Sequence, residues 1–221
     1  MGMDPRAVIP VMQREEAGME LQRVVERRRM WRNFDERPVP APALERIMSN
    51  ALHAPSAGFS QGWGFLVLTA PDDRALFWKT QWPEEQRAGP TSEGLLRAPV
   101  IVVPLSNKDV YLDRYAEPDK GWADRDEAHW PVPYWHIDTG FAAMLILLTA
   151  VDEGLGALFF GIWNADDLRR AFGVSDDYTP IGAMTIGYPA PDEPSPSLKR
   201  GRKGLEVVVH HGRWGVPMQT R

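Results

Sequence analysis

The chain has 221 residues without a cysteine, and its 25 basic and 30 acidic side chains leave a formal net charge of −5. The lack of cysteine excludes disulfides, thiolate nucleophiles and Cys-ligated zinc. The acidic balance argues against general nucleic-acid binding, which normally needs a basic excess.

The remaining bulk features predict one cytoplasmic domain over residues 1–221. Hydrophobic residues make up 43% of the chain, as is usual for a globular protein. No signal peptide is visible, and the most apolar run, 141–151, is shorter than the roughly 20 residues that cross a bilayer. No linker divides the sequence, although residues 1–18 resemble an N-terminal arm. We therefore expect neither a membrane nor a nucleic acid among its partners.

The first half of the chain alternates helical and extended patterns. A helix is predicted over 20–29, and a second begins near Pro42, where apolar residues recur every three or four positions, and ends before Pro55. Residues 64–69 and 99–103 are continuously apolar, which indicates inner strands of a covered sheet. A short helix is predicted between them, over 72–79.

The second half begins with a long polar and aromatic segment over 106–133, which we interpret as a possible lid because long insertions in compact domains are often functional. The helix predicted over 134–153 is apolar almost all round and should be buried on every side, with Gly154 ending it.

A strand over 157–161, a helix over 165–172 closed by Gly173, and strands over 181–188 and 205–210 complete the prediction. Helices and strands mix without strict alternation, so the expected fold class is α+β.

Two basic clusters lie near opposite ends of this acidic chain: Arg27, Arg28, Arg29 and Arg32, and Lys199, Arg200, Arg202 and Lys203. Brought together, their forked guanidinium groups could hold a phosphate. Taken alone, each cluster is more simply a solvated run of charge. Residues 55–63, between them, are small or polar and would let a backbone approach a flat ligand, or they form a plain loop from helix to strand. The five histidines lack metal-ligand spacing, so we expect no metal site.

Four segments, in the same order, resemble the nitroreductase family. Residues 28–34 and 38–39 are similar to its R-R-S-x-R-x-F…PV element, and 54–63 to its APSAGNxQPW element. Residues 154–161 resemble the GLG…G turn and strand that follow the family's long central helix, and 200–206 resemble its closing basic element. Each motif is short, and their joint order carries the resemblance.

The resemblance implies an α+β fold with a central mixed sheet flanked by helices, and a homodimer that holds two FMN molecules at its interface. It implies that the FMN phosphate is bound by Arg28, Arg29 and Arg32, joined by Arg200 and Arg202. The flavin ring would be lined by residues from the partner subunit: Pro55, Ser56, Ala57 and Gly58.

The same resemblance places Gln61 near the ribityl chain or ring, and the backbone N–H of Gly161, after Phe160, near flavin N5. The implied activity passes electrons from NAD(P)H to nitroaromatic, quinone or similar electron-poor planar substrates. NAD(P)H and the substrate would occupy the same site one after the other. The chemistry would be the cofactor's own, so no catalytic side chain is assigned. The lack of a GxGxxG motif fits a shared site.

Three residues depart from the family pattern. Met30 stands where Ser is usual, Phe59 where Asn is usual, and Gly62 where Pro is usual. The first two changes remove polar groups that could contact the cofactor. They leave open the same fold with dehalogenation, enone reduction, flavin fragmentation or deazaflavin-linked chemistry, and also a non-catalytic flavin-binding protein.

Overall fold

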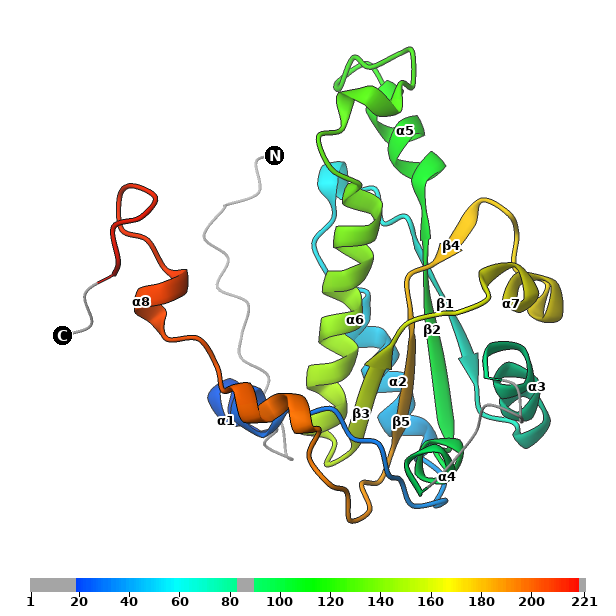
Figure 1. The fold of residues 1–221 in the computed structure, drawn as a ribbon. Helices are drawn as coiled ribbons and strands as arrows, with labels where there is room; N and C mark the ends of the chain where they lie inside the picture. Colours follow the sequence, from blue (N-terminus) through cyan, green and yellow to red (C-terminus); the bar gives the residue numbers. More distant parts are fainter. Residues whose placement is uncertain (1–18, 83–89, 219–221) are drawn as a thin grey trace, which may run out of the picture. The chain divides into compact units, whose positions relative to one another are not determined.

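A computed structural model describes residues 19–82 and 90–218, and the predicted N-terminal arm lies outside them. The chain separates after Ala190 into two compact units, which are described one at a time. The expectation of a single domain over 1–221 stays a prediction. Figure 1 shows the elements in chain order.

The first unit is built on a five-stranded sheet in the order β1-β2-β5-β3, with β4 pairing the far end of β2. The strands are β1 (Trp63–Leu68), β2 (Val100–Asn107), β3 (Gly156–Phe160), β4 (Tyr178–Pro180) and β5 (Ala183–Gly187). All pairs of these named strands are antiparallel. A parallel contact is present as an isolated bridge between Met30 and Ala157.

Strand β2 is the centre of the sheet, as its continuous apolar run predicts, and all eight of its residues are buried. Its side chains alternate between the two faces. Val100 and Val102 belong to one apolar cluster, and Ile101 and Val103 belong to the other. The prediction that β1 is also an inner strand was wrong, because β1 lies at the end of the strand order and is mostly half-buried.

Helices cover both faces of the sheet (Figure 1). The helices of the first unit are α1 (Leu21–Arg27), α2 (Ala41–Ala51), α3 (Pro71–Gln81), α4 (Pro90–Leu96), α5 (Lys108–Ala116), α6 (Tyr134–Asp152) and α7 (Ala165–Phe172). Helices α2 and α6 contribute the helical part of one apolar cluster, and α3, α4 and α7 contribute to the other. This arrangement confirms the α+β class.

Helix α6 has one face that the prediction placed wrongly. Its inner face is buried, but Ile137, Phe141 and Met144 are 37%, 46% and 46% exposed. Their spacing of four and three residues places them on one side of the helix. Helix α6 is long and apolar enough to cross a membrane, but 56% of its most apolar 18-residue stretch is buried inside the protein, which is typical of a core helix.

The ends of several elements follow from local chemistry. The side chain of Asn164 accepts the Asp167 N–H at the start of α7, and Gly173 ends that helix in a left-handed conformation with φ of 63°, as predicted. Gly154 follows α6 with φ of 72°. Pro71 occupies the first turn of α3, and two aspartates there face the positive end of the helix dipole.

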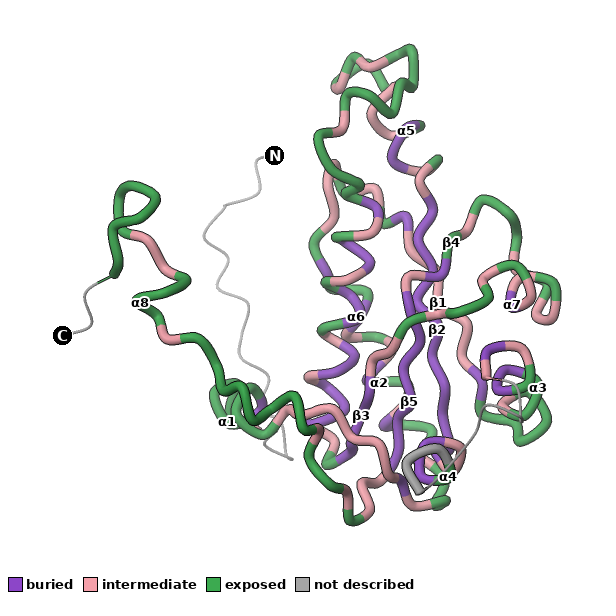
Figure 2. Tube along the Cα trace, in the orientation of Figure 1, coloured by how far each residue is buried: buried purple, intermediate pink, exposed green. Residues whose placement is uncertain are grey.

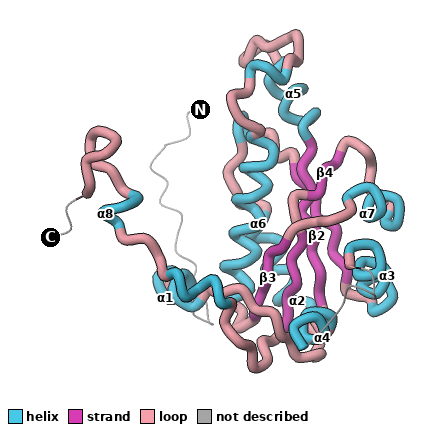
Figure 3. The backbone as a smooth tube through the Cα atoms, in the orientation of Figure 1, coloured by secondary structure: helices cyan, strands magenta, loops and turns pink. Residues whose placement is uncertain are grey.

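The segment 106–133, interpreted as a possible lid, contains regular structure for which the sequence analysis predicted no elements. Strand β2 continues to Asn107, α5 follows at once, and a short 3₁₀ helix spans Glu127–His129 (Figure 3). The side chain of Asn107 caps α5 by accepting the Val110 N–H. Whether the segment acts as a lid stays a prediction.

The second unit contains a 3₁₀ helix at Pro196–Arg200 and the four-residue helix α8 (Leu205–Val208). The predicted strand over 205–210 was therefore wrong, and a single bridge joins His210 to Pro217. None of the residues in the range 191–218 is buried, as Figure 2 shows. This unit has no core of its own to support a longer element.

Candidate functional site

The loop after α2 brings five of the predicted flavin residues into one tight turn. The Ser56 hydroxyl accepts the Gln61 N–H at 3.0 Å, and the Ala57 carbonyl accepts the Ser60 N–H at 3.1 Å. Pro55 and Gly58 complete the set. Gly58, Phe59 and Gln61 have φ of 60°, 56° and 53°. This left-handed conformation costs a residue other than glycine roughly 1–2 kcal/mol.

Phe59 is the most unusual residue of this turn. It stands where the family usually has Asn, which tolerates a left-handed backbone far better than Phe does. Its side chain is 75% exposed, so burial in the protomer offsets little of the conformational cost.

Helix α5 packs directly on this loop. Arg114 Nε donates to the Gly58 carbonyl at 3.0 Å. A β-carbon at Gly62 would lie 2.6 Å from Cε2 of Tyr111 and 2.7 Å from the Asn107 carbonyl oxygen. The Tyr111 ring therefore fills the space that a proline ring at position 62 would need, which explains the departure from the family at Gly62.

A buried acid on α6 also contacts the loop. Asp138 is 3% exposed, and its Oδ2 accepts the Ala57 N–H at 2.8 Å and the Tyr111 hydroxyl at 2.9 Å. Burial, with the hydrogen bond to Asp138 adding to it, raises the pKa of Tyr111. The sequence analysis missed Asp138, although an acid in an otherwise apolar helix was a visible signal.

The first basic cluster lies beside β3. The Trp31 N–H donates to the Ala157 carbonyl at 3.0 Å, which fixes residues 28–32 along that strand. Arg28, Arg29 and Arg32 are all half-buried, and the Arg29 guanidinium lies 3.5 Å from the centre of the Trp31 ring. The three predicted phosphate ligands of this unit are thus gathered on one short segment.

Met30 within this segment faces the protein interior. Its sulfur accepts the Phe159 N–H at 3.5 Å, and its side chain packs against both apolar clusters. The side chain that replaces the family's Ser is therefore a packing residue and supplies no donor to a phosphate.

The turn from β3 to α7 presents Gly161. This residue is exposed, and its N–H has no backbone acceptor among the described residues. Phe160, just before it, stacks on Trp78 of α3 with ring centres 5.7 Å apart and planes 11° apart. Aromatic packing of Phe160 therefore fixes one side of the turn that presents Gly161.

Gln81, at the end of α3, fixes the same turn from the other side. Its side chain is buried, and Oε1 accepts the N–H groups of Trp163 and Asn164, each at 3.1 Å. Its Nε2 donates to the Asn164 carbonyl at 2.7 Å. No pattern in the sequence indicates this role of Gln81, because its partners lie more than 80 positions away.

Arg200 and Arg202 lie in the second unit, where both are exposed, with Lys199 and Lys203 close in sequence. None of these four cations forms an ion pair with a described residue. Their predicted convergence with Arg28 and its neighbours joins two separately described units and stays a prediction.

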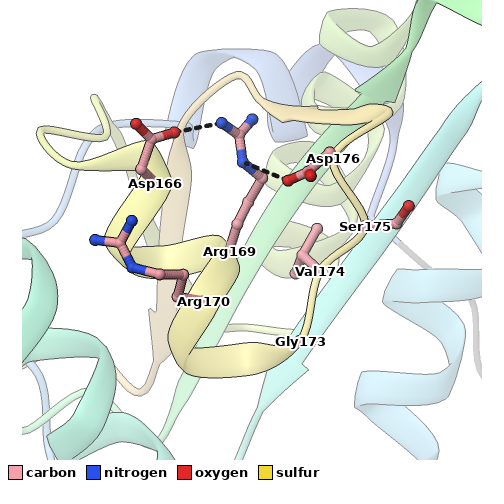
Figure 4. A pocket seen from close by; sticks show the side chains of 7 residues that line it. All are labelled: Asp166, Arg169, Arg170, Gly173, Val174, Ser175 and Asp176. Carbon is pink, nitrogen blue, oxygen red and sulfur yellow. Dashed lines mark hydrogen bonds and ion pairs between the residues drawn. The ribbon is translucent and has the colours of Figure 1, made fainter.

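A cleft of about 570 Å³ lies at the end of α7 (Figure 4). Arg169 on its wall pairs with Asp166, and with Asp176 at 4.0 Å. None of the predicted flavin residues lines it, and its arginine charge is already offset by carboxylates. We do not assign the cofactor to this cleft.

The residues present fit the group that the motifs imply. Arg28 is half-buried and forms no ion pair with any described carboxylate, so it can take an anionic phosphate. Gly161 offers an exposed N–H on a backbone that no β-carbon shields. In the parts of the chain that the structure describes, no group of three metal-ligating side chains comes together.

Comparisons with known proteins bear on the family and the fold of the chain. The model of the nitroreductase family matches residues 25–188. A provisionally named NADH dehydrogenase/NAD(P)H nitroreductase of Methanothermobacter thermautotrophicus is 27% identical over 176 residues, which cover 78% of each chain. An iodotyrosine deiodinase of Haliscomenobacter hydrossis is 24% identical over 209 residues, covering 86% of this chain and 89% of the relative.

Among solved structures, an FMN-dependent nitroreductase of Clostridium difficile superposes with a TM-score of 0.58 at 20% identity, covering 77% of this chain and 88% of the other. The fold is therefore that of the nitroreductases. The family match and these relatives support flavin-dependent oxidoreduction, with FMN and NAD(P)H, in general terms. Because the family match spans most of the length of the chain, the chain belongs to the nitroreductase family.

Proposed function

We propose that this protein is an FMN-dependent oxidoreductase that passes electrons from NAD(P)H to nitroaromatic, quinone or similar electron-poor planar compounds, and that it works as a homodimer in the cytoplasm. The observation that best supports this proposal is the exposed Gly161 N–H at the end of β3, on a turn fixed by Phe160 and Gln81. A donor held in place is what stabilises charge on a bound ring without reorganisation.

Phosphate binding is the proposed role of Arg28, Arg29 and Arg32, with Arg200 and Arg202. Guanidinium groups bind phosphate oxygens through paired, charge-assisted hydrogen bonds, so several of them on short segments give both affinity and orientation.

Ring binding is the proposed role of the loop with Pro55, Ser56, Ala57 and Gly58, and of Gln61 near the ribityl chain. FMN, when bound, supplies the hydride and electron transfer. Gly161 donates its N–H toward N5, and the missing side chain lets the backbone approach the ring closely. NAD(P)H and the acceptor use one site in turn, so the chain needs no second nucleotide-binding domain.

Dimerisation is supported by the exposed stripe Ile137, Phe141 and Met144 on α6. Contiguous apolar surface on a soluble domain usually marks an interface. Phe141→Glu should place a charge in the interface and convert the dimer to a monomer in light scattering after size-exclusion chromatography. Leu76→Glu, on the exposed side of α3 at 37% exposure, is the matched control and should leave the mass unchanged. A dimer that survives the first substitution would assign the interface elsewhere.

A second candidate activity is reductive dehalogenation of an aromatic substrate, which the similarity to an iodotyrosine deiodinase favours. Steady-state assays with a quinone, a nitroaromatic compound and an iodinated phenol, each with NADH and NADPH, separate the two activities. Turnover of the iodinated phenol alone would select this candidate.

The first experiment is the visible spectrum of the purified protein. We expect flavin absorbance, or its gain as FMN is titrated in, followed by bleaching under NADH or NADPH and recovery with a quinone. A colourless protein that takes up no FMN would refute the proposal. Flavin that binds but is never reduced by either nicotinamide would indicate a binding protein.

A further inference from the structure

Asp138 is the buried acid of the long, mostly apolar helix α6. Its carboxyl group is 3% exposed, and no basic side chain among the described residues pairs with it. A buried carboxyl group is costly unless hydrogen bonds satisfy it. The carboxyl group of Asp138 therefore depends on the hydrogen-bond donors that its oxygen atoms accept.

The two hydrogen-bond donors to Asp138 lie in the proposed flavin loop and in the helix that packs on it. A single oxygen, Oδ2, accepts the Ala57 N–H of the loop at 2.8 Å and the Tyr111 hydroxyl of α5 at 2.9 Å. The three segments come from positions up to 81 residues apart. One atom thus ties the loop and α5 to the core helix.

The loop needs this restraint because its own backbone is unfavourable. Phe59 and Gln61 both adopt left-handed conformations, which persist only where the surroundings determine them strongly. Contacts from α5 add to the restraint, since Arg114 Nε holds the Gly58 carbonyl and the Tyr115 ring would lie 2.8 Å from a β-carbon at Gly58.

We propose that Asp138 is the positioning residue of the flavin loop, and that α5 is the fixed support of that loop through Tyr111. This inference rests on the proposed function, because it concerns the loop assigned to the flavin ring. Asp138 touches neither the cofactor nor the substrate in this role. It acts by holding the Ala57 amide, and with it the left-handed turn, in the conformation that receives the ring.

The test compares Asp138→Leu with Thr139→Val in the full-length protein. Thr139 is the adjacent, fully buried residue, and its hydroxyl bonds only within α6, to the Trp135 carbonyl at 2.7 Å. Two readouts are used: FMN affinity from fluorescence titration, and hydrogen exchange of loop amides 55–62 in the FMN-free protein.

We expect Asp138→Leu to weaken FMN binding by about tenfold or more and to speed exchange at Ala57 and its neighbours, because it removes the acceptor of the half-buried Ala57 N–H and of the buried Tyr111 hydroxyl. Thr139→Val should leave both within about twofold of the native protein, since its lost bond lies outside the loop. Equal FMN affinity and equal loop exchange in the two variants would overturn the proposal.

Two further variants cover the case in which Asp138→Leu does not fold. Asp138→Asn retains a carbonyl acceptor of the same shape and should restore FMN affinity to within about threefold of native, as expected when acceptor geometry rather than charge is required. Tyr111→Phe removes only the α5 bond and should still speed loop exchange; native exchange would contradict the role of α5. If the native protein binds no FMN, the proposed function fails, while the exchange comparison still decides whether Asp138 positions the loop.

Discussion

Replacing Phe59 by Asn should stabilise the protein, although Phe59 lies in the proposed flavin loop. Its φ of 56° costs a residue other than glycine roughly 1–2 kcal/mol, and Asn avoids much of that cost. Full burial of a Phe side chain contributes about 1.5–3 kcal/mol, and a side chain that is 75% exposed gains only about a quarter of it. The expected net gain is about 0.5–1 kcal/mol.

In a chain of this length, such a gain corresponds to a rise in Tm of about 1–4 °C. Differential scanning calorimetry of the FMN-free protein measures it, with Phe59→Leu as the control. Leu, like Phe, lacks the amide group that lets Asn hydrogen-bond to its own backbone, so it keeps the conformational cost and should give no rise. If Phe59→Asn melts at or below Phe59→Leu, the left-handed backbone does not carry the cost assigned to it, and the Phe59 ring is packed in the assembled protein.

Three further predictions follow from buried contacts. Gln81→Leu should lower the free energy of unfolding by about 2–3 kcal/mol, since it leaves the Trp163 and Asn164 N–H groups without their acceptor and removes one of the two donors to the Asn164 carbonyl; urea titration measures it. Gly62→Ala should cost about 1–3 kcal/mol because its methyl group meets the Tyr111 ring and the Asn107 carbonyl, as thermal denaturation would record. Burial lowers the pKa of His136 from its ordinary value of 6.5, so the unfolded chain binds the proton more readily, and stability should fall as the pH drops below about 6.5.

Each of these predictions has a matched control. Thr80→Val, next to Gln81 on α3, removes a bond to the Phe77 carbonyl and a long bond of 3.4 Å from Gln81 Nε2, but it leaves the bonds from Gln81 to Trp163 and Asn164 in place and should cost less than about 1 kcal/mol. Gly140→Ala places a methyl group where nothing lies within 4 Å and should not destabilise α6. His136→Gln should remove its part of the pH dependence. For the first two predictions, a control as destabilised as its variant contradicts the reasoning; for the third, a His136→Gln protein with the native pH dependence of stability contradicts it.

Local chemistry made several elements predictable from the sequence. Helix α7 has its N-cap Asn164 and its left-handed Gly173 within ten positions, so both ends are encoded nearby. Strand β2 is apolar on both faces because both faces are covered. By contrast, β1 has the same apolar composition but lies at the end of the strand order, a property that depends on pairing and not on the strand's own residues. The terminal run 205–210 is rich in β-branched residues but has no sheet to join within its unit.

The candidate site also contains residues that short sequence motifs predict and residues whose roles depend on distant partners. The tight turn at 55–61 and the arginines beside β3 follow from motifs, and the structure brings each group together within a short segment. Gln81 could not be assigned, because hydrogen bonds across more than 80 positions leave no periodic pattern. Asp138 stands out as an acid in an apolar helix, but its partner Ala57, 81 positions away, could not be predicted for the same reason. The departures at Met30 and Gly62 became interpretable only when their neighbours, Phe159 and Tyr111, were known.

The burial of β2 along its whole length has a kinetic consequence. Amides in a strand that is paired on both sides and covered on both faces exchange only when the entire domain opens. Asn107, its last residue, donates its N–H to the Gly62 carbonyl at 2.8 Å and caps α5. The loop proposed to hold the flavin is thus hydrogen-bonded to β2, the strand whose amides should exchange most slowly. Any fluctuation that admits a substrate must therefore originate in other segments.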